Sequence, residues 1–449
     1  MSASHLGRRA QRLLACVLAF ICLAVSAPVP ALAARKASDI VDGTPASERG
    51  LATSDLPDIS AKQAIVMTPD GTAIFERDAD TPIKIASITK VMTALVALEN
   101  SKLTDVITVD RKAATVGESA VGLKEGDTLT MEEALKGLLI MSGNDAAMAI
   151  ATGVGAKMDP ESDDPYQVFI DAMNAKAKEL GCTDSVYENP HGLDFNGWEG
   201  DLHSTARDVV TVFAAAMKNE DFHRLDGSSE STMTVTGEDG KERTISLVAR
   251  NKILGEDGNI GGKTGSTYDA GECFVGAFER DGIQVYAAVF GTDSNKARFG
   301  NTTTLADWYY DHLTTLPAVN TKVMSGNAPI VARATAADWT DKTVNVTVAD
   351  PTQTIDSVFS LAGKVEQEVR LKELTGNIQA GQDAGTITYT QDGTKVGEVK
   401  LVTANAQVSP NPFEWMMIQI DRIGRFLGNQ PSAAKAEVLN EAPEMQAAA

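Results

Sequence analysis

Three short motifs occur in order along this chain and contain the side chains that an acylating serine site needs. They are Ser87-Ile88-Thr89-Lys90, Ser142-Gly143-Asn144 and Lys263-Thr264-Gly265. The first places an amine one helical turn from a hydroxyl, the second joins a hydroxyl to an amide, and the third sets a cation beside a hydroxyl. Each motif alone is common, so the prediction depends on their order and structural context.

Ser87 is the candidate nucleophile and Lys90 is the candidate base. Residues three positions apart lie on the same face of a helix, so the Lys90 amine can reach the Ser87 hydroxyl. A lysine accepts a proton only when neutral, which requires a pKa well below the usual value of about 10.4. Burial would lower this pKa, and a second cation in the cleft, for which Lys263 is the candidate, would lower it further.

The other two motifs suit substrate handling. Ser142 and Asn144 fall between two predicted helices, where the hydroxyl can pass a proton to a leaving amine and the amide can hold a substrate carbonyl. Lys263 and Thr264 fall on a predicted strand and would bind a free carboxylate by charge and hydrogen bond. The N–H of Ser87, at a helix start, would face a developing oxyanion.

Other classes of chemistry find little support. The histidines contain no His-x-x-x-His pair, so neither a metal site nor a cofactor is expected. Gly262-Lys263-Thr264 resembles the end of a phosphate-binding loop, but Asp257 stands where that loop needs its first glycine. The formal net charge of −21 argues against nucleic acid as a partner, because such a surface repels phosphate.

The N-terminus predicts export. Arg8, Arg9 and Arg12 precede an apolar run over 13–25 and a small-residue cleavage pattern, so residues 1–33 are interpreted as a signal peptide. An uncleaved membrane helix is the alternative, but the run is shorter than the roughly 20 residues that a bilayer needs. Residues 34–58 are expected to form a flexible leader.

Cleavage would leave two cysteines. Cys182 and Cys273 are far apart in the sequence, which favours two separate buried thiols. Export makes a disulfide between them the alternative.

The residues from 59 to 316 predict an α/β (α+β) domain. Ala64-Ile65-Val66-Met67 and Ala73-Ile74-Phe75-Glu76 read as a hairpin around Pro69-Asp70-Gly71. Apolar periodicity predicts helices over 87–99, 131–141, 144–153, 165–180 and 204–218. Later β-rich runs predict strands over 259–267, 271–280 and 283–291. The expected fold is an antiparallel sheet built from both ends of the domain, with helices packed on it.

The C-terminal third has a different texture. Alternating and β-branched runs over 317–406 predict a small all-β domain. An amphipathic helix follows over 410–428, with an apolar face that suits a membrane surface or, as the alternative, the protein's own β-domain. Residues 430–449 are expected to form a disordered tail.

With these residues in view, the chain resembles the low-molecular-weight penicillin-binding proteins, and most closely the serine-type D-alanyl-D-alanine carboxypeptidases, which have a β-lactamase/transpeptidase-like fold. The resemblance extends over about 60–428. It rests on Ala86-Ser87-Ile88-Thr89-Lys90-Val91-Met92-Thr93, Met141-Ser142-Gly143-Asn144-Asp145-Ala146, Asn189-Pro190-His191-Gly192-Leu193-Asp194 and Gly262-Lys263-Thr264-Gly265.

The resemblance implies a reaction. Ser87 would be acylated by a peptidoglycan stem peptide ending in D-Ala-D-Ala, the terminal D-alanine would leave, and water would free the shortened peptide. Lys90 would act as the base, Ser142 as the proton relay and Asn144 as a substrate contact. Penicillins would acylate the same serine.

The resemblance also implies the substrate-binding residues. Lys263 and Thr264 would hold the terminal carboxylate, with Gly265 on the same strand. The N–H groups of Ser87 and Ser266 would form the oxyanion hole. Arg250 resembles an arginine that supports carboxylate binding, whereas a plain surface charge is its alternative.

The resemblance places the enzyme outside the cell, attached peripherally to the outer face of the cytoplasmic membrane through the C-terminal helix. Two other functions remain open. A class A-like β-lactamase needs a deacylating base, for which Glu188 is the one tempting residue. A peptidoglycan-binding protein without catalysis is the second, although Ser87, Lys90 and Lys263 argue against it.

Overall fold

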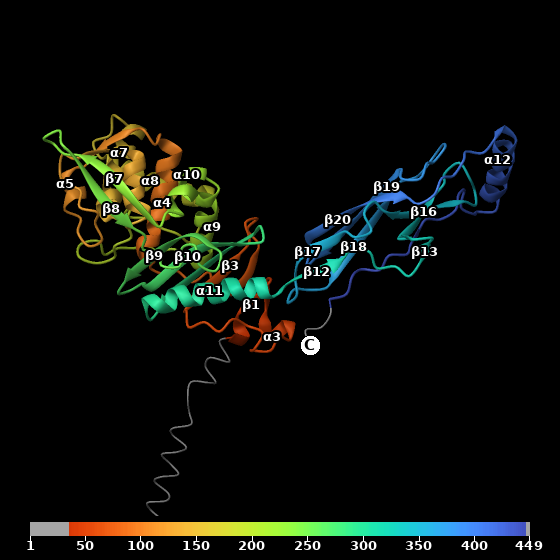
Figure 1. Cartoon of the computed structure of the whole chain (residues 1–449), viewed down its shortest axis with the longest axis horizontal. Coiled ribbons are helices and arrows are strands. Elements are labelled where there is room, and N and C mark those ends of the chain that lie inside the picture. Colours follow the sequence, from red (N-terminus) through yellow and green to blue (C-terminus); the bar gives the residue numbers. More distant parts are fainter. Residues whose placement is uncertain (1–35, 446–449) are drawn as a thin grey trace, which may run out of the picture. The chain divides into compact units, whose positions relative to one another are not determined.

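The computed structural model describes residues 36–445, and the chain divides after Tyr310 into two compact units. Figure 1 shows both units, with the colours following the sequence. The predicted signal peptide, residues 1–33, lies outside the described residues. The sequence predicted the catalytic domain to end at 316, but residues 313–317 form a strand of the second unit.

The first unit is built on a seven-stranded sheet in which all neighbouring strands are antiparallel. The strand order is β2-β1-β4-β3-β11-β10-β9. The strands are β1 Ile40–Val41, β2 Thr44–Pro45, β3 Gln63–Met67, β4 Ala73–Arg77, β9 Asn259–Thr267, β10 Gly271–Arg280 and β11 Ile283–Thr292. Early and late strands therefore join in one sheet, and the expected fold class is confirmed.

Helices cover both faces of this sheet. The helices of the described part of this unit are α3 Ala46–Arg49, the 3-10 helix η1 Ala86–Thr89, α4 Lys90–Asn100, α5 Arg111–Ala114, α6 Met131–Leu139, α7 Asn144–Met158, α8 Pro165–Glu179, α9 Ala206–Met217, α10 Glu220–Asp226 and α11 Asn295–Asp311. Some pack directly on the sheet and others pack on those helices. On one face α9 packs Phe213 edge-on against Tyr286 of β11. On the other, α11 packs Phe299 against Phe274 of β10.

Helix α4 is the centre of the domain core. Its residues from 90 to 97 are all buried, so it lacks the polar face that a surface helix shows. The sequence predicted only one apolar face here, because the small residues Ala94 and Ala97 and the buried Thr93 carry a weak hydrophobic signal. A helix buried on every side gives the catalytic residues at its start a fixed frame.

A four-stranded sheet was missed by the sequence analysis. It contains β5 Val106–Thr108, β6 Thr128–Thr130, β7 Glu230–Thr236 and β8 Glu242–Val248, in the order β5-β6-β7-β8. The β7–β8 hairpin is rich in charged and hydroxyl residues, and its exposed positions alternate with partly buried ones and with the buried Met233, Val235 and Leu247. Such polar strands lack the apolar run that marked the other strands.

The expected flexible leader is wrong for the residues from 36 to 58. Asp39, beside β1, accepts hydrogen bonds from Arg77 of β4 at 2.8 and 2.6 Å, and both side chains are buried. Arg49 donates to the Val41 carbonyl oxygen at 2.7 Å. A short polar segment is thus fixed by ion pairs and strand pairing, which composition does not reveal.

The second unit is all-β apart from one helix. Its main sheet has six strands in the order β18-β19-β20-β16-β15-β21, beside the pairs β12–β17 and β13–β14. The strands are β12 Leu313–Pro317, β13 Met324–Ser325, β14 Ala328–Pro329, β15 Ala332–Thr335, β16 Thr343–Val348, β17 Thr354–Phe359, β18 Val365–Leu371, β19 Asp383–Gln391, β20 Thr394–Thr403 and β21 Glu437–Val438. Its core is aliphatic around Tyr389.

Strand β21 and Asn440 correct the prediction for the C-terminal tail. The tail was expected to be disordered, but β21 pairs with β15 at the sheet edge. Asn440 is buried, and its amide donates to Gln367 Oε1 at 2.9 Å and to the Tyr389 hydroxyl at 3.2 Å. An edge strand two residues long carries no detectable sequence pattern.

The predicted C-terminal helix is α12, Pro412–Leu427. Asn411 caps it: its side-chain oxygen accepts from the N–H groups of Phe413 and Glu414, and the Glu414 carboxylate accepts from the Asn411 N–H. Ile418 is the buried residue of the helix. Within residues 36–445, no helix is long and apolar enough to cross a membrane.

Candidate active site

Ser87 and Lys90 stand where η1 passes into α4. Lys90 Nζ lies 2.7 Å from Ser87 Oγ, 2.7 Å from Asn144 Oδ1 and 3.0 Å from the His191 carbonyl oxygen. A neutral amine donates to the last two oxygens and accepts from the Ser87 hydroxyl. Three oxygens therefore fix the amine at hydrogen-bond distance from the candidate nucleophile. The sequence-predicted pair of hydroxyl and amine is present in the geometry that proton transfer needs.

The environment of Lys90 favours the neutral amine. Its side chain is fully buried. Burial holds the pKa of Lys90 well below its usual value, and the positive charge of Lys263 lowers it further, against a smaller opposing effect of Asp145. These are the two causes that the sequence argument required for a lysine base.

The loop before α7 brings Ser142 and Asn144 into the site. Ser142 has φ 61°, a left-handed conformation that non-glycine residues adopt at some cost. The Asp145 carboxylate fixes a neighbouring loop by accepting the N–H groups of Val121, Gly122 and Leu123 at 2.8 to 3.1 Å. Strain at Ser142 is thus held in place by a well-bonded buried acid.

Strand β9 carries the second lysine along the other wall. Lys263 Nζ donates to Ser142 Oγ at 2.8 Å and to the Thr264 carbonyl oxygen at 2.9 Å. Burial lowers the pKa of Lys263 to about 7. At Gly265 a Cβ would lie 2.6 Å from the Ile85 carbonyl oxygen, so only glycine lets β9 approach η1 this closely.

A cavity of about 220 Å³ opens above these residues. It is lined by Ser87, Ser119, Ser142, Arg250, Lys252, Thr264, Gly265, Ser266, Asn295 and Arg298. Lys90, Asn144 and Lys263 are buried behind this lining. Lys90 is hydrogen-bonded to Ser87 and Lys263 to Ser142, whereas the Asn144 side chain is connected to the lining through Lys90. All nine sequence-predicted site residues are therefore brought together, six in the lining and three behind it.

The cavity lining includes residues that sequence reasoning missed. Arg298 of α11 donates to the Gly265 carbonyl oxygen at 3.0 Å and forms an ion pair with Glu272. Glu272 also accepts from the Ser266 hydroxyl at 2.8 Å. Burial lowers the pKa of Arg298. No motif marks an arginine on a late helix, so only the fold could bring it to the cleft.

The His191–Gly192 turn supports Lys90 from below. A Cβ at Gly192, which has φ 85°, would lie 1.8 Å from the Ala86 carbonyl oxygen, so the turn requires glycine. His191 is buried against Trp198, and burial lowers the pKa of its ring to about 2. His191 therefore contributes a neutral buried ring and a backbone carbonyl that holds Lys90, and its side chain does not line the cavity.

The sequence expectation for the two cysteines has an outcome in the structure. Cys182 and Cys273 are separate buried thiols, as expected. Burial raises the pKa of each to about 12, so neither is a reactive thiolate. Among residues 36–445, no group of three or more histidine, cysteine and acidic side chains is arranged to hold a metal ion.

Comparison with known proteins gives this geometry a family. Residues 51–294 match the D-alanyl-D-alanine carboxypeptidase family, and residues 321–408 match the family of the C-terminal domain of penicillin-binding protein 5. The chain belongs to the D-alanyl-D-alanine carboxypeptidase family. It is a serine-type D-alanyl-D-alanine carboxypeptidase, a hydrolase within the penicillin-binding proteins.

Individual relatives agree with this family. D-alanyl-D-alanine carboxypeptidase DacF of Bacillus subtilis is 27% identical over 79% of this chain and 87% of its own length. DacB2 of Mycobacterium tuberculosis is 34% identical over 56% of this chain and 83% of its own. The crystal structure of the Streptomyces K15 DD-transpeptidase superposes with a TM-score of 0.53 at 30% identity, covering 57% of this chain and 98% of that one.

Proposed function

We propose that the chain is exported, and that it removes the terminal D-alanine from peptidoglycan stem pentapeptides through an acyl-enzyme at Ser87. The observation that carries the proposal is the fully buried Lys90 amine, 2.7 Å from Ser87 Oγ and beside a second cation. Such an amine is the base that a serine nucleophile needs when no histidine or metal activates it.

In the acylation step, Ser87 Oγ attacks the carbonyl carbon of the penultimate D-alanine and passes its proton to Lys90. The N–H groups of Ser87 and Ser266 stabilise the oxyanion. The C–N bond then breaks, and the leaving amine takes a proton from the Ser142 hydroxyl, which the neighbouring Lys263 ammonium replenishes. Asn144 fixes Lys90 and the substrate carbonyl on the same side of the cleft.

The terminal carboxylate binds along β9. Thr264 lines the cavity, and Lys263 and Arg298 supply positive charge directly behind it. Arg250 lines the same cavity, with its Nε 3.4 Å from the Met141 carbonyl oxygen, so its charge faces the cleft. A free carboxylate is therefore the chemical feature that this end of the site selects.

Before deacylation, Lys90 releases to solvent the proton taken from Ser87 and Lys263 takes one up, which restores the starting charges. Water, in the place of D-alanine, then attacks the ester carbonyl and gives a proton to Lys90, which returns it to Ser87 Oγ as the ester bond breaks. Penicillins acylate Ser87 in the same way, but their ring-opened product leaves no small fragment to make room for water. The candidate β-lactamase base, Glu188, accepts from the Leu202 N–H at 3.1 Å and does not line the cavity. This favours a long-lived penicillin adduct over rapid penicillin hydrolysis.

The C-terminal helix supports attachment to a membrane surface. The apolar residues Phe413, Ile420, Ile423 and Leu427 of α12 are between 56% and 80% exposed, whereas Ile418 is buried. The alternative, docking of this face on the β-domain, would bury these side chains. An exposed face of this kind, on a helix too short and charged to span, suits the headgroup region of a bilayer.

The test of the proposed activity is release of D-alanine from a muramyl-type pentapeptide by the purified protein. The wild type and Ser266→Ala, which keeps the backbone N–H, are expected to release it, because the Ser266 side chain has no role in the chemistry. Ser87→Ala is expected to release none. Equal release by Ser87→Ala, or none by the wild type, would refute the proposal.

A further inference from the structure

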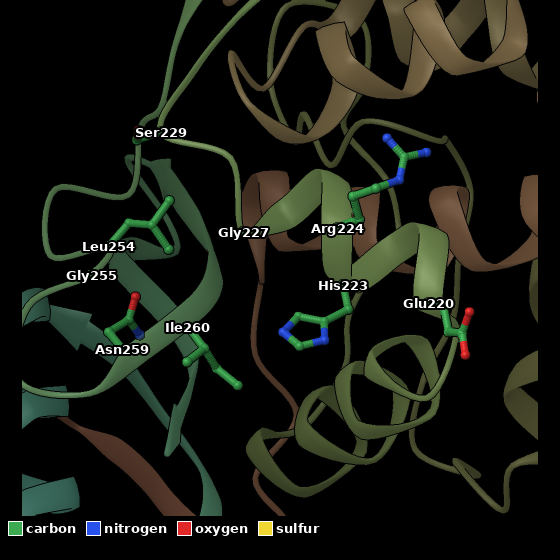
Figure 2. Close-up of a pocket in the computed structure, with 9 residues that line it drawn as sticks. All are labelled: Glu220, His223, Arg224, Gly227, Ser229, Leu254, Gly255, Asn259 and Ile260. Carbon is green, nitrogen blue, oxygen red and sulfur yellow. The ribbon is translucent and has the colours of Figure 1, made fainter. Parts of the chain in front are cut away.

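The end of α10 packs against the start of β9, behind the active-site cavity. Figure 2 shows the groove at this junction, which His223 and Arg224 of α10 and Asn259 and Ile260 of β9 help to line, with the His223 ring directed toward Ile260. Asp226, the last residue of α10, does not line the groove. It is 5% exposed, and in the part of the chain that the structure describes its Oδ2 has no hydrogen-bond partner.

The buried carboxylate lies on the face of β9 that carries Lys263. A Cβ at Gly261 would stand 2.7 Å from Asp226 Oδ2, so glycine at this position makes room for the carboxylate. Residues two apart on a strand point to the same face, which places Gly261 and Lys263 side by side. The Gly262 N–H, between them, helps to lower the pKa of the Asp226 carboxyl.

We propose that Asp226 is the counter-charge of Lys263, a positioning residue that keeps this ammonium protonated and directed at Ser142 so that the site recognises a terminal carboxylate. The proposal rests on the proposed function of the site. It assigns a role to a carboxylate that stands outside the three motifs and outside the cavity lining.

The charges around Lys263 explain why a counter-charge is needed. Arg298 and Arg250 are cations that act on Lys263 and disfavour its charge. Burial lowers the pKa of Lys263 to about 7, and Asp226 is the acid that raises it against burial and the neighbouring cations. Without this carboxylate, the ammonium would lose its proton in the pH range where Lys90 must be neutral.

The pKa of Asp226 sets the pH range of the effect. Burial raises it to about 6, against the Gly262 N–H and the charge of Lys263, which lower it. Below that pH the carboxyl is neutral and the wild type resembles an Asp226→Asn variant. Above it the carboxylate supports Lys263, so any difference between the two proteins grows as the pH rises.

The first test compares Asp226→Asn with the wild type on two peptides, one ending in a free D-Ala carboxylate and one ending in the corresponding amide. At pH 8 we expect KM for the free carboxylate to rise about tenfold, the factor that one pKa unit represents. KM for the amide peptide should change little, whereas any fall in kcat, which reports proton supply from Lys263 through Ser142, should be the same for both peptides. At pH 5.5 the two proteins should agree on both peptides.

The second test displaces the carboxylate without removing it. Gly261→Ala puts a methyl group against Asp226 Oδ2, whereas Gly300→Ala, on α11, meets no atom within 4 Å. We expect Gly261→Ala to show the same selective loss for the free carboxylate, and Gly300→Ala to behave as the wild type. This pair keeps the proposal testable if Asp226→Asn does not fold.

The outcomes separate this proposal from the proposed function. An equal rise in KM for both peptides, or a rise that does not depend on pH, would overturn the role of Asp226 while leaving a working carboxypeptidase. Absence of D-alanine release from the wild type would instead refute the proposed function. The pH above which kcat/KM for the free-carboxylate peptide falls should be lower in Asp226→Asn than in the wild type. Such a shift, with an unchanged melting temperature, would support the role of Asp226 as counter-charge.

Discussion

The two units of the chain treat charged and apolar side chains in opposite ways. The first unit buries many ionisable residues, among them Lys90, Lys263 and Asp226. In the described part of the second unit, the buried polar side chains are neutral, namely Thr340, Thr347, Gln391, Thr403 and Asn440. The second unit instead exposes large apolar residues, concentrated on α12.

This difference separates chemistry from attachment. Burying an unpaired charge costs several kcal/mol, so a fold retains such residues where a shifted pKa is useful. Exposed apolar side chains contribute no hydrophobic stabilisation until another surface covers them, so a large exposed apolar patch indicates a binding surface. The first unit thus carries an electrostatic cost at its catalytic site. The second unit leaves an apolar face on α12 that a membrane surface can cover.

The largest expected effect is on Lys90. Lys90→Met keeps an apolar stem in the pocket but removes the base, so the rate of penicillin acylation should fall about a hundredfold to ten-thousandfold. Stopped-flow labelling with a fluorescent penicillin measures this rate. A Lys90→Met protein that acylates at the wild-type rate would show that the buried charge has no chemical use.

The next effect is on stability rather than activity. Asp39→Asn breaks the buried pair with Arg77 and leaves that cation unpaired, which should lower the free energy of unfolding by about 3 to 5 kcal/mol. Denaturant unfolding of the first unit measures it. Because neither residue contacts the cavity, the acylation rate of folded protein should stay within a factor of two; a fall in rate of the same size would mean that this buried charge also serves catalysis.

A smaller effect concerns the exposed face of α12. Each isoleucine buried in a lipid interface contributes about 1.5 kcal/mol, so Ile420→Ser with Ile423→Ser should weaken vesicle binding about a hundredfold. Co-sedimentation with zwitterionic lipid vesicles measures this, with Val408→Ser, an exposed valine before the helix, as control. Unchanged vesicle binding would contradict the proposal that the exposed face of α12 attaches the protein to a membrane. Substitution is preferable to truncation, because β21 and Asn440 follow the helix and belong to the β-domain.

The smallest effect is on Asn440. Asn440→Ala leaves the Gln367 amide oxygen and the Asn320 N–H without their partner, at a cost of about 1 to 3 kcal/mol to the second unit. Thermal unfolding should show this loss, and D-alanine release should be unaffected. An unchanged melting temperature would mean that the tail contributes nothing to this domain.

Residues that belong to short motifs could be predicted from the sequence, and those that depend on tertiary contacts could not. Ser87 and Lys90 share one helical turn, and the strands β9 and β10 begin and end at the predicted residues. Arg298 and Asp226 reach the site only because α11 and α10 pack on the sheet.

The leader and the tail show the same limit. Asp39 acquires its role from Arg77 across the sheet, and β21 from the free edge of β15. Both segments are short and polar, so periodicity gives no signal, and their order comes entirely from long-range partners. Sequence analysis predicted that the leader and the tail are unstructured because the contacts that stabilise them are not local.

The central claim is that Ser87 is the acylated residue, activated by Lys90. The most direct measurement is peptide mass mapping of the purified protein after incubation with benzylpenicillin. We predict one added penicillin per chain, carried by the peptide that contains Ser87 and absent from Ser87→Ala. Labelling on another residue, or undiminished labelling of Ser87→Ala, would contradict the account.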